Sequence, residues 1–116
     1  MPFSTLDQPA YAAQADLFRA LGHPARIRIL ELLIEGDRSV SSLLEEIGLE
    51  PSTLSQHLAV VKRAGLVESS RKGNAVIYRL ADASVGQFLA AARNVLASTL
   101  RKARLALEKL EGPGSR

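Results

Sequence analysis

Apolar residues recur at helical spacing over the first third of the chain. One stripe, in residues 9–21, consists of Tyr11, Ala15, Phe18 and Leu21, and Gly22 ends it. A broader apolar face follows and consists of Ile27, Ile29, Leu30, Leu33 and Ile34. Because proline suits the first position of a helix, His23-Pro24 marks the start of this face, with His23 as a capping or packing residue. The pattern predicts two helices, the second of them central to the core.

Two shorter helices follow. Ser39 is a good N-cap for a helix that runs to Ile47, and Gly48 stops it. Pro51 opens the next helix, which reaches Ala64 before a glycine. Two short helices joined by a tight turn that contains glycine are typical of a helix-turn-helix, here residues 39–64.

A hairpin is predicted next. Residues 66–70 and 75–80 are short strand candidates, and the second alternates Val76 and Tyr78 with Ile77 and Arg79. Residues 71–74, Arg-Lys-Gly-Asn, form the turn between them, with glycine and asparagine where positive backbone angles are needed. A two-stranded hairpin with a basic tip, directly after a helix-turn-helix, is typical of a wing, here residues 66–80.

The remainder of the chain predicts one long helix. From Asp82, the predicted N-cap, to Leu110 there is no proline, and the composition favours helix. An apolar stripe recurs at steps of three and four residues. Since a helix of about 28 residues overhangs the core of so small a domain, the stripe needs a partner, and the commonest one is the same helix of a second subunit. We therefore expect a homodimer whose interface contains Tyr11, Phe18, Leu89, Ala92, Leu96, Leu100, Ala103 and Leu107.

Length and composition narrow the class of protein. The 116 residues, 47% hydrophobic and 23% charged, fit one globular domain over residues 9–111, with flexible ends at 1–8 and 112–116. No stretch approaches the roughly 18 apolar residues of a membrane span and no leader pattern opens the chain, so we expect a cytoplasmic protein. The chain contains no cysteine, which excludes disulfides and thiolate metal sites.

Positive charge is concentrated in one third of the chain. The net charge is only +3, but residues 51–80 hold five cations against Glu68 alone, a net +4. The preceding residues 36–50 hold one cation against four acids, a net −3. The basic part coincides with the second helix of the helix-turn-helix and the wing, which points to a nucleic-acid partner.

The helix from Pro51 divides into two faces. Leu54, Leu58 and Val61 face the core, and the opposite side carries small and polar residues that fit a major groove, where glutamine pairs with adenine and arginine with guanine. Any amphipathic surface helix shows such a polar face, so the order of helix, turn, helix and basic hairpin carries the inference. The expected DNA-binding residues are Ser52, Thr53, Ser55, Gln56, His57, Lys62, Arg63, Arg71, Lys72 and Asn74.

The roles within this set differ. Gln56 and Arg63 are expected to read bases, and Lys62, Arg71 and Lys72 to contact phosphates or the minor groove. His57 lies between the two faces, where a DNA contact and a half-buried structural histidine are both open. With no partner expected nearby, neither His57 nor His23 is predicted to bind metal.

Four segments resemble the ArsR/SmtB family of winged-helix repressors. They are residues 21–30 (LGHPARIRIL), 54–58 (LSQHL), 62–67 (KRAGLV) and 71–78 (RKGNAVIY), and the likeness runs from about Ala10 to Leu110. The resemblance implies a homodimer joined by its first and last helices, with two recognition helices on an imperfect DNA palindrome. It also implies that an inducer releases the promoter, and that half-sites lie one helical turn apart.

The chain departs from the metal sensors of that family. Ser39 and Ser41 stand at the positions of their Cys-Val-Cys element, and residues 82–110 contain no histidine. Serine is a poor ligand for soft metals, so we expect no metal and no cofactor. The expected partners are operator DNA and a second copy, with an unknown small molecule or protein as effector. A protein-interaction module without DNA binding is the alternative, and no motif predicts an enzyme.

Overall fold

The computed structural model describes residues 9–112, and its elements follow the predicted order with one addition. The helices are α1 (Pro9–Leu21), α2 (Pro24–Glu35), α3 (Val40–Ile47), α4 (Pro51–Arg63) and α5 (Ala83–Glu111). The strands are β1 (Arg38–Ser39), β2 (Val67–Lys72) and β3 (Ala75–Leu80). Of the predicted flexible ends, all but Gly112 lie outside the described residues.

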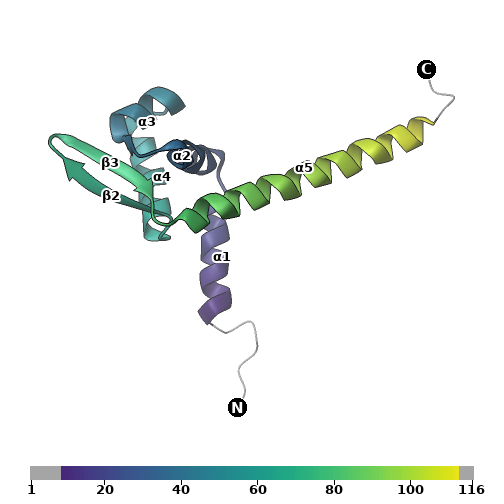
Figure 1. The fold of residues 1–116 in the computed structure, drawn as a ribbon, viewed down its shortest axis with the longest axis horizontal. Coiled ribbons are helices and arrows are strands. Elements are labelled where there is room, and N and C mark those ends of the chain that lie inside the picture. The colour runs from purple at the N-terminus through teal and green to yellow at the C-terminus, as the bar shows by residue number, and fades with distance from the viewer. Residues whose placement is uncertain (1–8, 113–116) are drawn as a thin grey trace, which may run out of the picture. The chain divides into compact units, whose positions relative to one another are not determined.

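The chain forms two compact units, one up to Gly86 and the other from Gln87. The first unit contains α1 to α4, all three strands and the first turn of α5, and the second is the remainder of α5. Figure 1 shows α2, α3 and α4 gathered together in the first unit, with the β2–β3 hairpin projecting from them. This is the winged helix-turn-helix arrangement that the pattern predicted.

Helix α2 is the centre of the first unit, as predicted, and contacts α1, α3, α4 and β3. Ile29, Leu30 and Leu32 are fully buried, each worth about 1.5–3 kcal/mol of hydrophobic stabilisation. The buried face of α2 is rotated by part of a turn from the predicted face. Leu32 is buried, whereas Ile27 and Ile34 are exposed. These two isoleucines are seven residues apart and therefore share one edge of the helix.

Local sequence sets the helix boundaries. The imidazole Nδ1 of His23 accepts a hydrogen bond of 3.0 Å from the Ala25 amide and caps α2, and Ser39 Oγ accepts one of 3.1 Å from the Ser42 amide at the start of α3. Gly48 ends α3 with a φ of +78°, a left-handed conformation that favours glycine. The predicted roles of His23, Ser39 and Gly48 are thereby confirmed.

The sheet has three strands rather than the predicted two. β1 pairs antiparallel with β3, with Arg38 opposite Tyr78 and Ser39 opposite Ile77, so that the order is β1-β3-β2. Two residues are too short for a recognisable alternation, and β1 was therefore not predicted. The pairing of β1 with β3 connects the start of the helix-turn-helix to the wing.

The wing turn is tighter than predicted. β2 continues through Arg71 and Lys72, which pairs with Ala75, and only Gly73 and Asn74 form the turn. Gly73 has a φ of +63°, whereas Asn74 does not have a positive φ, contrary to the prediction. A two-residue turn with positive φ at its first position alone has the signs of a type II′ turn, which matches the twist of a hairpin.

Candidate nucleic-acid interface

Helix α4 presents the two faces that its sequence predicts. Leu54, Leu58 and Val61 are buried, which anchors the helix to the core. The opposite face is exposed and includes Ser52 and Gln56. Pro51 starts the helix at its first turn, so this polar face begins immediately after the turn from α3. A rigid helix with short polar side chains outward is suited to entering a major groove.

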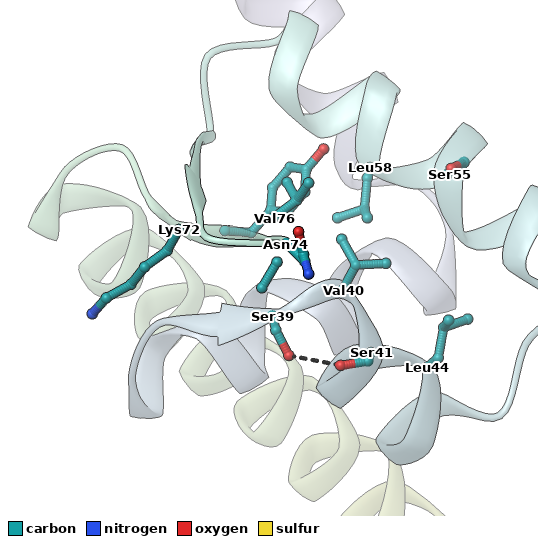
Figure 2. A pocket seen from close by; sticks show the side chains of 11 residues that line it. Ser39, Val40, Ser41, Leu44, Ser55, Leu58, Lys72, Asn74 and Val76 are labelled. Atoms are coloured by element: carbon teal, nitrogen blue, oxygen red, sulfur yellow. Dashed lines mark hydrogen bonds between the residues drawn. The ribbon is translucent and has the colours of Figure 1, made fainter.

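A groove of about 720 Å³ lies between α3, α4 and the wing. Three of the predicted DNA-binding residues line it, namely Ser55 from α4 and Lys72 and Asn74 from the hairpin. In Figure 2 the Asn74 side chain lies in the middle of the group, whereas that of Lys72 extends away from it. Hydroxyl, amide and ammonium donors around one groove are the groups that bind phosphate oxygens of a nucleic-acid backbone.

Sequence reasoning missed three polar residues of this groove: Ser39, Ser41 and Tyr78. The hydroxyls of Ser39 and Ser41 are 3.1 Å apart and share a hydrogen bond, which Figure 2 marks. The pairing of β1 with β3 brings them to the wing. The sequence had marked Ser39 as a cap, and Ser39 and Ser41 as the serines at the positions of the Cys-Val-Cys element, but neither signal indicates which strand will lie beside them.

The cations of the wing differ in their environment. Arg79 forms an ion pair of 3.2 Å with Glu68, the only acid of residues 51–80. Among residues 9–112, no carboxylate lies within ion-pair distance of Arg71 or Lys72. The unpaired positive charge of the wing therefore lies toward the hairpin tip, at Arg71 and Lys72. Phosphate groups of a nucleic-acid backbone would neutralise it there.

Lys62 links the recognition-type helix to the wing. Its Nζ donates a hydrogen bond of 2.8 Å to Ser69 Oγ on β2. The sequence predicted Lys62 as a phosphate contact on the flank of α4, and its ammonium retains two further donors for that role. The hydrogen bond connects the end of α4 to β2 at the surface.

His57 has a neighbour that the sequence did not predict. Its ring lies 4.3 Å from that of His23, centroid to centroid, and the planes are tilted by 42°. Burial, followed by the electrostatic effects of the neighbouring His23 and Arg26, lowers the pKa of His57. The expectation that no histidine lies near His57 was wrong, because the α2 cap packs against the middle of α4.

Arg63 lies apart from the groove. It lines a separate hollow with Arg19 of α1 and Arg26 of α2, at the end of α4. The sequence placed Arg63 on the same face as Gln56, seven residues earlier, and the exposure of both is as expected. Its predicted guanine contact remains a prediction.

The predicted dimer residues divide into two groups by exposure. Leu96 and Leu100 on α5 are 57% and 60% exposed, and Tyr11 and Phe18 on α1 are also exposed. Leu89, by contrast, is 3% exposed, and its part in the interface remains a prediction. Ala92, Ala103 and Leu107 are exposed as the α5 stripe requires.

The part of the chain that the structure describes contains neither a cluster of metal ligands nor a membrane-spanning helix. No three side chains of histidine, cysteine, aspartate or glutamate gather so as to hold a metal ion. None of the helices between residues 9 and 112 combines the length and apolar character of a membrane span.

Known proteins resemble this chain closely. The model of the family described as "Bacterial regulatory protein, arsR family" matches residues 23–69. The uncharacterized HTH-type transcriptional regulator Rv0081 of Mycobacterium tuberculosis is 51% identical over 109 residues, which are 93% of this chain and 96% of that protein. A biofilm growth-associated repressor of Xylella fastidiosa is 35% identical over 89 residues, covering 77% and 78% of the two chains.

Solved structures agree with the sequence relatives. The crystal structure of Rv0081 superposes with a TM-score of 0.79 at 52% identity, covering 84% of this chain and 98% of that one. The solution structure of a homodimeric winged helix-turn-helix DNA-binding domain, Mb0332 of Mycobacterium bovis, gives 0.75 at 30% identity over 84% and 90% of the chains. With its fold, its motifs and relatives that match nearly its full length, this chain belongs to the ArsR family of winged helix-turn-helix transcriptional regulators.

Proposed function

We propose that this regulator is a cytoplasmic, dimeric repressor that binds an imperfect palindrome in a promoter. The observation that carries the proposal is the groove between α3, α4 and the wing, which adjoins the exposed polar face of α4 and the uncompensated cations Arg71 and Lys72. In this arrangement α4 reads bases and the wing holds the backbone. We assign it no catalytic role.

The dimer is proposed from the apolar face of α5. Val95, Leu96, Leu100, Leu107 and Leu110 are all more than half exposed. So long an apolar face on a helix requires a partner, and a second copy related by two-fold symmetry covers both faces at once. The homodimeric state of the related Mb0332 domain supports the same assembly.

The signal that releases DNA is proposed to be neither a thiolate-bound metal nor thiol oxidation. The chain has no cysteine, and the hydroxyls of Ser39 and Ser41 are hydrogen-bonded to each other. Titrating Zn²⁺, Ni²⁺ and Cu²⁺ into the protein–operator complex should leave the affinity for DNA unchanged. A large shift with any one of them would contradict this part of the proposal.

Selection of bound duplexes from a genomic pool tests the proposal directly. We expect an inverted repeat with half-sites about one helical turn apart, and an affinity that falls steeply with salt. The control is a scrambled duplex of the same length and composition. If the selected and scrambled duplexes bind equally at physiological salt, sequence-specific repression is refuted and a protein partner becomes the better explanation.

A further inference from the structure

A second hollow lies in the first unit, with a volume of about 370 Å³, and shares no residue with the groove described above. Three arginines from three helices line it: Arg19 of α1, Arg26 of α2 and Arg63 of α4. Asp16 is the one acid in its wall. Its remaining lining consists of small apolar side chains, including Ala20 and Val60.

The charges of this hollow are not balanced. Arg19 forms an ion pair with Asp16. Within residues 9–112, neither Arg26 nor Arg63 forms an ion pair or hydrogen bond, and the Nε of Arg26 is buried without an acceptor. A buried N–H of a charged group is costly unless an acceptor satisfies it. Two arginines therefore line the hollow without an ion-pair partner, since Asp16, the one acid of the wall, pairs with Arg19.

Helix ends explain only part of this cluster. Arg19 and Arg63 lie in the last turns of α1 and α4, where the helix dipole favours a cation. Arg26, however, lies in the first turn of α2, where the dipole disfavours a cation, and it adds to the positive charge near His57. Its position is unfavourable in the free protein and becomes favourable once an anion occupies the hollow.

We propose that this hollow binds a small organic dianion, with one carboxylate on Arg26 and the other on Arg63. Guanidinium and carboxylate groups form paired, charge-assisted hydrogen bonds, and the net charge of the four lining ionised groups, +2, matches two carboxylates. Ala20 and Val60 offer an apolar wall to the carbon chain between them. The volume lies at the lower end of the range for small-molecule sites, which selects a short dicarboxylate.

Occupancy of this site would act on α4. The ligand would tie the end of α4 to α1 and α2, and the same helix carries Ser52 and Gln56 on its exposed face. If the proposed function holds, the dianion and the operator influence each other's affinity by the same factor. This coupling rests on the proposed function, whereas the binding site itself does not.

Calorimetric titration of the full chain with succinate, at constant ionic strength and without DNA, tests the site. We expect saturable binding that Arg26→Gln and Arg63→Gln each weaken by about tenfold or more, since each removes one paired contact. Asp16→Asn should tighten binding because it removes the acid from the wall. Arg101→Gln, an exposed arginine of α5, is the matched control and should bind as the wild type does.

Amide chemical shifts locate the ligand independently of affinity. Succinate should shift the amides of Ala20 and Ala64 and leave those of the wing in place. Absence of saturable binding, equal binding by all four variants, or tighter binding of inorganic phosphate than of succinate would overturn the proposal. Because Arg63 and Asp16 are exposed, their variants test the site even if Arg26→Gln fails to fold. Since these assays contain no DNA, their failure is distinct from a failure to bind an operator.

Discussion

At the scale of the residue, the packing of His57 makes the stability of the fold depend on pH. Burial and the nearby His23 and Arg26 lower its pKa in the folded chain, so between that value and about 6.5 the unfolded chain binds the extra proton. The free energy of unfolding should therefore fall as the pH falls through about 6.5, and level off below the pKa of the folded form. His57→Gln should flatten this dependence, as measured by urea unfolding across the range.

Only two histidines occur in the chain, which makes that experiment clean. His23 caps α2, so substituting it would also remove a helix cap and confuse the comparison. Lys72→Gln, which removes a charge on the wing without changing a histidine, serves as the control. It should keep the wild-type slope of unfolding free energy against pH. An unchanged slope in His57→Gln would show that another group governs the titration.

Gln56 and Lys72 separate base reading from backbone binding. Gln56→Ala should reduce discrimination between the operator and a single-base variant by about 1–3 kcal/mol, because a base contact is lost. Lys72→Ala should weaken all duplexes alike and reduce the slope of log affinity against log salt by about 1, because one phosphate contact is lost. Fluorescence anisotropy at several salt concentrations measures both. Identical behaviour of the two variants would contradict the division of roles.

At the scale of the element, Asp82 starts α5. Its Oδ2 accepts a hydrogen bond of 3.1 Å from the Ser84 amide and another from the Ser84 hydroxyl, and these bonds lower the pKa of the Asp82 carboxyl. Asp82→Ala should lower the melting temperature, as loss of an N-cap does, and Asp82→Asn should restore most of it. Thermal unfolding of the three proteins checks this, and equal melting temperatures would show that α5 needs no cap.

Helices were predicted from the sequence more fully than the sheet was. Proline, serine and glycine mark the ends of α2 to α4 within a few residues, because caps act locally. β1 was missed because its pairing with β3 joins residues about forty positions apart and leaves no local pattern. For the same reason the sequence did not predict that His23 packs against His57, or that Arg26 and Arg63 line one hollow. Helical periodicity identified the exposed face of α4, whereas the neighbours of that face depend on tertiary packing.

At the scale of the whole molecule, the proposed dimer depends on α5. Leu100→Glu would place a negative charge on the apolar face of each subunit. Each leucine removed would also lose about 1.5–3 kcal/mol of the hydrophobic free energy of dimerisation. The dissociation constant of the dimer should therefore rise by about a hundredfold or more. Sedimentation equilibrium measures it, with Arg101→Gln as the control on the next residue. A monomeric wild type would refute the assembly, and unchanged dimerisation of Leu100→Glu would refute this interface.

The junction between β1 and α3 determines where the chain tolerates insertions. Ser39 pairs with Ile77 as the last residue of the strand and caps α3 with its hydroxyl, so no residue lies free between the two elements. A residue inserted after Ser39 would disrupt either the strand pairing or the helix cap. A residue inserted at the exposed turn of Gly73 and Asn74 would only lengthen a loop. Length variation in evolution, and tags or reporters in the laboratory, should accordingly be accommodated at the hairpin tip and excluded after Ser39.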